Sequence, residues 1–174
     1  MQPERGPLTR GLRAAGSFLL RVPWPLGLVL LGSWGFLIWD LSSHRAPHLA
    51  GPSLFWELAS NLAHAPLFGI LTLFAAALVL RARAGAWPRP EPARIALVLA
   101  LVVGYGALDE WHQSHIPGRD ASLLDVLTDG VSAVLVLWIV FVLARRELSE
   151  RALLARLGGG VLLCVACAAL ALLA

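Results

Sequence analysis

The stretch Leu108–Gly130, "LDEWHQSHIPGRDASLLDVLTDG", contains four aspartates, one glutamate, two histidines and one arginine. The chain around it has 174 residues, of which 58% are hydrophobic and 14% are charged. Long apolar runs lie on both sides of the stretch, so two membrane spans meet here. The stretch therefore decides how these spans pair and where the polar chemistry of the chain is gathered.

The composition of the chain is that of a membrane protein. A mean hydropathy of +0.74 leaves too few polar residues to cover a soluble globule. A helix needs a run of about 20 apolar residues to cross the hydrocarbon core of a bilayer. We therefore expect an all-α fold, a polytopic transmembrane helical bundle. The five expected spans are residues 24–41, 62–80, 93–112, 123–144 and 157–174.

The arginines predict the orientation of these spans, since the chain has no lysine. All of them except Arg45 and Arg119 fall on one side of the predicted membrane. The positive-inside rule then places the N-terminus in the cytoplasm and the C-terminus outside, in a multi-pass protein of the inner (cytoplasmic) membrane. The net charge is +3 and is spread over several loops, so we expect no nucleic-acid partner.

The chain divides into three expected parts. Residues 1–22 are basic and weakly amphipathic, which is typical of a segment lying on the anionic inner leaflet. A cleaved signal peptide is the competing interpretation, and the length of the first apolar run argues against it. Residues 23–156 form the transmembrane core and residues 157–174 a C-terminal transmembrane helix. Two cysteines in this last helix are expected to pack rather than to act in redox chemistry.

Small residues predict where the helices approach each other. Ala96, Ala100 and Gly104 recur every four residues, a pattern that allows close helix contact in membranes. Gly130 and Ala133 are the expected matching face on the next span.

Ionisable and polar residues of three spans are expected to converge near the outer leaflet. An aspartate at mid-bilayer costs about 2.5 to 3.5 kcal/mol, so such groups must be hydrated, paired or turned inward. His64 is placed in the first turn of the second span, and Arg119 is the expected partner of the acids or of an anionic ligand. The predicted site residues are His64, Asp109, Glu110, His112, Gln113, Arg119, Asp125 and Asp129.

Several of these residues also have a structural interpretation, which fits Asp129 least because it lies about 6 Å deeper in the membrane than Asp125. Ser122 and Asp125 fit a capping box at the start of the fourth span. Asp109 and Glu110 fit interfacial acids satisfied by Arg119. The histidines fit solvated or helix-end residues.

Two kinds of chemistry are open to this site. Acid/base catalysis would use Asp109, Glu110, His112 or Asp125, and ligand binding would use His64, Gln113, Arg119 and Asp129. No hydrolase or phosphate-loop motif is present. Asp109, His112 and Asp125 are hard or borderline ligands, but their spacing matches no known metal motif, so we expect no metal and no cofactor.

The stretch "DEWHQSHIPGRDASLLDVLTDGVSA" resembles the signature of the VanZ-like membrane proteins, in which an acidic D-E-x-x-Q segment precedes a P-G-R turn and an acidic helix. "NLAHAPLFGIL" resembles the earlier segment of that family, with His64 as its histidine. The resemblance covers residues 60–140. The chain departs from the family at Asp129, often asparagine there, at Ser132, usually glycine, and at Ser60 and Asn61, often Asp-Lys.

The resemblance implies a small polytopic membrane protein, in a family whose founding members are associated with low-level resistance to the glycopeptide teicoplanin. We therefore expect a protein that binds or modulates an outer-leaflet envelope component. Its expected partners are membrane lipids, a lipid-linked cell-wall precursor or the glycopeptide itself. A membrane-embedded acid/base enzyme acting on lipid-linked substrates is the alternative. A small transporter is a second alternative, which the apolar inner halves of the spans disfavour.

Overall fold

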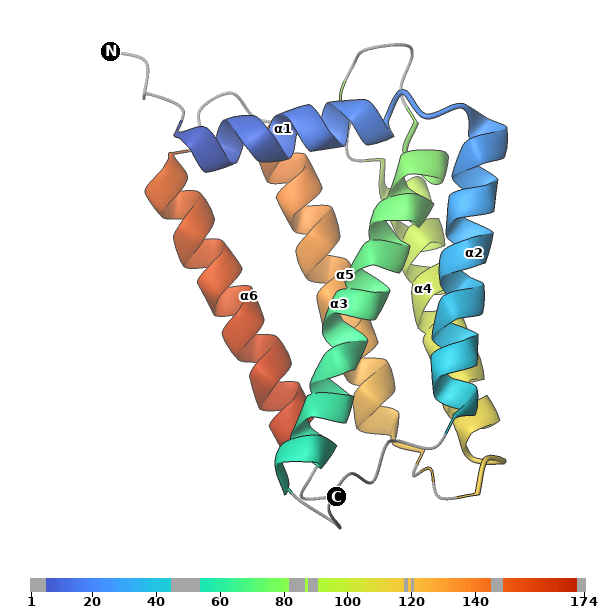
Figure 1. The fold of residues 1–174 in the computed structure, drawn as a ribbon. Coiled ribbons are helices and arrows are strands. Elements are labelled where there is room, and N and C mark those ends of the chain that lie inside the picture. The colour runs from blue at the N-terminus through green and yellow to red at the C-terminus, as the bar shows by residue number, and fades with distance from the viewer. Residues whose placement is uncertain are drawn as a thin grey trace.

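The computed structural model describes residues 6–44, 54–81, 87, 91–117, 119, 121–144 and 149–171. The described chain is helical and contains no strand, and five of its helices are long and apolar enough to cross a membrane. The expected all-α bundle with five spans is thereby confirmed (Figure 1). The helices are α1 (Pro7–Leu19), α2 (Trp24–Ser43), α3 (Leu54–Val79), α4 (Pro92–Gln113), α5 (Leu123–Ala144) and α6 (Glu150–Leu170).

Helix α1 lies across one end of the bundle, at a steep angle to the five spans (Figure 1). Pro7 opens the helix, where its missing N–H costs no hydrogen bond. The backbone N–H of Leu8 donates to Oε1 of Glu150 at 2.9 Å, which joins α1 to the start of α6. The segment expected at the membrane surface thus folds as a helix along the end of the spans. Residues 1–5 lie outside the described part.

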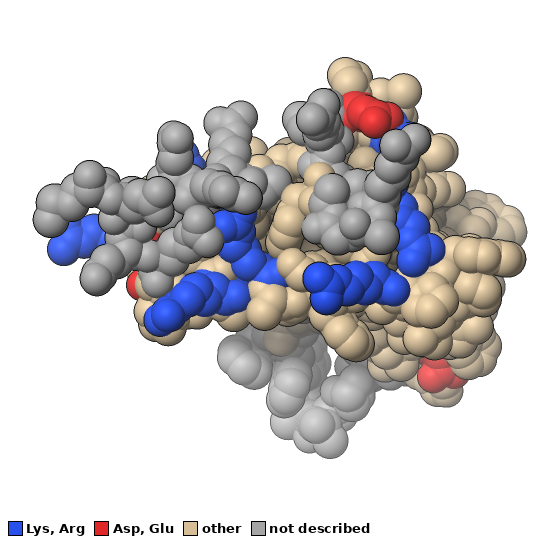
Figure 2. Space-filling model, turned by 90° about the horizontal axis from the view of Figure 1, so that it is seen from above, with Lys and Arg blue, Asp and Glu red and all other residues tan. Residues whose placement is uncertain are grey.

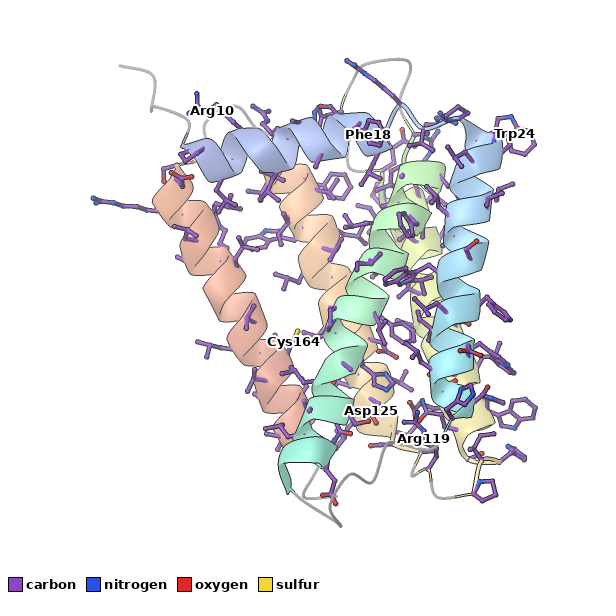
Figure 3. The ribbon with its side chains drawn as sticks, in the orientation of Figure 1. Arg10, Phe18, Trp24, Arg119, Asp125 and Cys164 are labelled. Carbon is purple, nitrogen blue, oxygen red and sulfur yellow. The ribbon has the colours of Figure 1, made fainter. Side chains whose placement is uncertain are left out.

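The two ends of the bundle differ in charge. We call the end covered by α1 the arginine-rich end, and Figure 2 shows arginine side chains spread over it. We call the other end, where Arg119 and Asp125 lie, the acidic end (Figure 3). The two ends correspond to the two sides of the membrane that the arginine distribution predicts. Which end faces the cytoplasm stays a prediction. The arginines outside the described residues are Arg5, Arg45, Arg83, Arg89, Arg145 and Arg146.

Helices α3, α4 and α5 form the centre of the bundle and share its apolar core. Phe68, Val98 and Ala133 are fully buried in this core. Three polar side chains also bond to backbone carbonyls of neighbouring helices, the kind of contact that ties helices together where lipid supplies no hydrophobic drive. They are Trp34 Nε1 to Leu67 O (2.8 Å), Tyr105 Oη to Gly35 O (2.6 Å) and Ser132 Oγ to Ala65 O (2.6 Å).

Two of the expected span boundaries were wrong. Helix α3 begins at Leu54 rather than at residue 62, because a helix continues through polar residues such as Glu57 and Ser60 that interrupt the apolar run. Helix α6 begins at Glu150 rather than at 157, because Ser149 caps it by accepting a hydrogen bond from the N–H of Ala152 at 3.3 Å. His64 consequently lies ten residues into α3, not in its first turn.

The small-residue row on α4 does not pack against another of the described helices. Its three members are exposed, whereas Val98, Val102 and Gly106 face the core. The buried row continues into Asp109 and Glu110, whose carboxyl groups are costly in lipid. Burying these acids therefore sets the rotation of α4 and leaves the small residues outside. The exposed row is Ala96, Ala100 and Gly104.

The two small residues expected to form a packing face on α5, Gly130 and Ala133, are packed against neighbouring side chains. Ala133 is 0% exposed, and a Cβ added to Gly130 would lie 3.6 Å from Val103 of α4.

We predict opposite outcomes for the same enlargement at two alanines. Ala133→Leu places three extra carbon atoms in a closed core and should lower the free energy of unfolding by about 1 to 3 kcal/mol. Ala100→Leu, on the exposed side of α4, should change it little. Unfolding of both variants in mixed micelles measures the difference. Equal destabilisation by the two substitutions would contradict the observed rotation of α4.

Candidate functional site

Helices α3, α4 and α5 bring six polar side chains together near the acidic end. Five of them are at most 5% exposed. Four of these five are acids, which are rarely buried so completely. Figure 3 shows Asp125 at this end, far from Arg10 at the other. We call the group the acidic cluster. Its members are His64, Asp109, Glu110, Gln113, Asp125 and Asp129.

His64 joins the three helices of the cluster. Its Nδ1 lies 3.1 Å from Oδ1 of Asp129, and its Nε2 lies 3.8 Å from Oε1 of Glu110. An ionised carboxylate only accepts hydrogen bonds, so Nδ1 donates to Asp129 when that carboxyl group is ionised. The ring also lies parallel to that of Phe68, with centroids 5.7 Å apart. These contacts fix the imidazole and direct Nε2 toward Glu110.

Gln113 orders the end of α4. Its Nε2 donates to Oδ2 of Asp109 at 2.9 Å and approaches Oε1 of Glu110 at 3.4 Å. Residues 109, 110 and 113 lie on one face of a helix because they are three and four positions apart. The amide group of Gln113 therefore holds two neighbouring carboxyl groups in place without adding charge.

The start of α5 is not closed by the expected capping box. Ser122 does cap the helix, since its Oγ accepts from the N–H of Leu124 at 3.1 Å. The N–H of Ser122, however, donates to Oε2 of Glu110 at 2.8 Å instead of to Asp125. The carboxylate of Glu110, from α4, thus accepts the hydrogen bond that Asp125 would accept in a capping box. Asp125 is left available to the cluster.

Three carboxylate oxygens of the cluster are buried without a hydrogen-bond partner among the described residues. They are Oδ1 of Asp109, Oδ1 of Asp125 and Oδ2 of Asp129. An unsatisfied buried polar group costs about 1 to 3 kcal/mol, and more when it is charged. Each such group in a native structure calls for an explanation, such as a catalytic role, a bound water or an ion. The cluster therefore offers carboxylate oxygens to which a water, an ion or a ligand can bind.

Arg119 is not the partner of these acids. Its Nε donates to the carbonyl oxygen of His44 at 2.9 Å and its Nη2 to that of Leu41 at 2.6 Å. The last carbonyl groups of a helix have no partner inside the helix, and the guanidinium supplies one at the end of α2. Burial lowers the pKa of Arg119, and the carboxyl groups of Asp109 and Glu110 raise it. Its charge therefore acts on the acids from a distance.

His112 lies outside the acidic cluster, so its expected pairing with Asp109 or Glu110 is not formed. Its Nε2 is 2.9 Å from Oγ of Ser43, and its ring stacks on Trp39 with centroids 3.8 Å apart. Two residues along a helix rotate a side chain by about 200°, so position 112 faces α2 when position 110 faces α3. His64 occupies the place that we expected for His112.

A cavity of about 380 Å³ lies between α2, α3 and α4 beside the cluster. Ile38, Leu41 and Leu67 are among its apolar lining residues. Its polar lining includes His64, Asp109, Gln113 and Arg119. The cavity thus combines apolar walls with acidic, imidazole and guanidinium groups.

The sequence predictions missed Gly106 and its part in the cluster. A Cβ at this position would lie 2.4 Å from Oδ2 of Asp129, so the glycine makes room for the buried carboxyl group. The signal was available, because Gly106 is three positions before Asp109 and so shares its helix face.

Gly106→Ala and Gly104→Ala should therefore change the free energy of unfolding in opposite directions. An alanine is favoured over glycine in a helix by about 1 kcal/mol, and nothing lies within 4 Å of a Cβ at Gly104. Gly104→Ala should raise the free energy of unfolding. Gly106→Ala should lower it, because Asp129 must move away from His64. Thermal unfolding in detergent measures both variants, and equal stabilisation of the two would contradict this packing.

Comparison of the chain with family models, curated proteins and solved structures gives no match. The arrangement of the site therefore supplies the basis for a functional proposal, together with the sequence resemblance described above.

Proposed function

We propose that the protein binds an amphiphilic component of the membrane or cell envelope in the cavity beside the acidic cluster. The candidates are a lipid with a polar headgroup, a lipid-linked cell-wall precursor and a lipid-tailed glycopeptide. Binding modulates the outer leaflet and gives low-level glycopeptide resistance. The one observation that carries the proposal is a cavity with apolar walls and several polar groups between three membrane spans.

The chemistry of the cavity supports an amphiphile over a purely polar solute. Binding sites for small molecules are mostly apolar, with a few polar groups that fix the orientation. An acyl chain suits walls such as Ile38 and Leu67, and a headgroup suits the imidazole and guanidinium groups. Two nitrogens of the Arg119 guanidinium already donate to backbone carbonyl oxygens. The side chain therefore contributes positive charge to the binding of an anion, rather than a pair of parallel hydrogen bonds.

The position of the cavity supports an outer-leaflet ligand. Arg119 of its lining lies at the end opposite the arginine-rich end, and it donates a hydrogen bond to the carbonyl oxygen of His44, which also lines the cavity. If the arginine-rich end faces the cytoplasm, as the positive-inside rule predicts, these groups face outward. The resemblance to VanZ-like proteins favours the same leaflet, because the associated antibiotic acts on cell-wall synthesis outside the membrane.

A second candidate function is acid/base chemistry on the bound molecule, and the His64–Asp129 pair favours it. An imidazole oriented by a buried carboxylate is a common general base. Its Nε2 faces Glu110, and His64 also lines the cavity. Proton transfer to and from a ligand in the cavity is therefore possible without His112.

Filling the cavity should abolish ligand binding. Ser60→Phe places a ring in the cavity lining, whereas Ser33→Phe places the same ring on the exposed side of α2. Native mass spectrometry of the full chain from a bacterial membrane should find a co-purified lipid or lipid-linked molecule. We expect Ser60→Phe to lose it by about tenfold or more, a change of about 1.4 kcal/mol, and Ser33→Phe to retain it. Cells that express Ser60→Phe should accordingly be more susceptible to teicoplanin than cells that express the parent chain or Ser33→Phe.

Undiminished ligand in a well-folded Ser60→Phe variant would contradict binding in this cavity. The same preparation separates the two candidate functions. A binding protein releases the molecule unchanged. An enzyme shifts the lipid profile of expressing cells relative to cells that express a variant lacking His64.

A further inference from the structure

We infer that His64, Glu110 and Asp125 form a binding site for one divalent transition-metal cation. Each residue offers one ligand atom, and these three atoms lie within 4.8 Å of one another. The three residues come from α3, α4 and α5, so the ion would join the central helices of the bundle. The site differs from the set weighed in the sequence, where Asp109 and His112 accompanied Asp125.

His64 has the orientation of a metal ligand. Histidines that bind metals usually donate their other ring N–H to a carboxylate or carbonyl, which fixes the tautomer and the ring. Here Nδ1 bonds to Asp129 at 3.1 Å, and the free Nε2 points toward Glu110. Asp129 is fully buried, so this supporting hydrogen bond is shielded from water.

Glu110 and Asp125 supply the carboxylate ligands. Oε2 of Glu110 is held by the N–H of Ser122, which leaves Oε1 on the side of His64. Asp125 is 5% exposed, and its Oδ1 has no hydrogen-bond partner in the described structure. This oxygen is buried without a partner, and its side chain is grouped with two further ligand atoms. That is the separate observation that points to a bound cation.

The charge of the cluster also favours a cation. Four carboxyl groups lie together in the membrane-spanning helices, and His64 is the one basic side chain that the described residues place in direct contact with them. Arg119 is occupied by the end of α2. A divalent ion would balance the two carboxylates that bind it, in a setting where charge is weakly screened.

One imidazole nitrogen and two carboxylate oxygens suit Zn²⁺ or Mn²⁺. Ligand atoms about 2.1 Å from a tetrahedral ion are about 3.4 Å apart. Nε2 and Oε1 are 3.8 Å apart and all three ligand atoms lie within 4.8 Å of one another, so the side chains must close in on the ion. Cys164 and Cys167, the softer ligands of the chain, lie on α6 away from the site. Three protein ligands would leave a coordination position open on the ion, and one of the three residues, His64, also lines the cavity.

The test uses the full chain, purified with a tag that lacks histidine, in a Cys164→Ser/Cys167→Ser background that removes both thiols. Elemental mass spectrometry measures the metal that co-purifies. Equilibrium dialysis after chelator treatment measures affinity for Zn²⁺ and Mn²⁺, and the visible spectrum of bound Co²⁺ reports the ligand type. We expect about one ion per chain with nitrogen and oxygen ligation.

Two variants probe the ligands and one probes the support. Asp125→Asn and Glu110→Gln should each weaken binding by about 100-fold or more, and Asp129→Asn by about 10- to 100-fold. Asp40→Asn is the matched control, because Asp40 is an exposed aspartate of α2, and it should bind as the parent does. Gel filtration and circular dichroism check that each variant is folded.

Failure of the parent chain to bind Zn²⁺, Mn²⁺ or Co²⁺ at about 100 μM would overturn the inference, as would unchanged affinity in Asp125→Asn. If the variants do not fold, the Co²⁺ spectrum of the parent still decides the matter. Ser60 lines the cavity and is not one of the three proposed ligands, so loss of lipid binding in Ser60→Phe with metal retained would separate this site from the proposed function.

Discussion

The contact of His64 with Asp129 and Glu110 is the interaction around which the acidic end is arranged. It joins α3, α4 and α5 through one imidazole ring, at 3.1 Å to Asp129 and 3.8 Å to Glu110. Lipid cannot solvate a carboxyl group, so each acid of the spans must find its partner inside the bundle. Removing one partner of such a buried pair costs about 3 to 5 kcal/mol. The rest of the site adjusts to keep this pair together.

Several features of the fold follow from that constraint. Helix α4 turns its acids inward and leaves its small residues exposed, and Gly106 yields the space that Asp129 needs. Glu110 accepts the N–H of Ser122, which closes the start of α5 and leaves Asp125 to the cluster. Arg119 closes the end of α2 from the same loop. Arg119, which stabilises this helix end, also lines the cavity beside the cluster.

Much of this arrangement could be predicted from the sequence. Apolar runs and the distribution of arginines are enough to give five helical spans with two unlike ends. The cost of burying Asp109, Asp125 and Asp129 predicts that they converge. The helix ends were harder to predict. Hydropathy alone does not show that α3 continues through Glu57 or that α6 starts after the cap Ser149.

The pairing inside the site was the hardest part to predict. Charge alone suggested Arg119 as the partner of the acids, since it is the nearest cation in the sequence. The structure gives that place to His64, which is far away along the chain, because α3 packs against both α4 and α5. His112 is close in sequence but faces α2. Pairing between helices depends on their relative rotation, and one sequence carries little information on that rotation.

A double-mutant cycle on His64 and Asp129 tests the central contact most directly. His64→Phe keeps a ring that can pack on Phe68, and Asp129→Ala removes the carboxyl group. The free energies of unfolding of the parent, both single variants and the double variant should give a coupling energy of about 1 to 3 kcal/mol. Effects that add to within about 0.5 kcal/mol would contradict a direct interaction between the two residues.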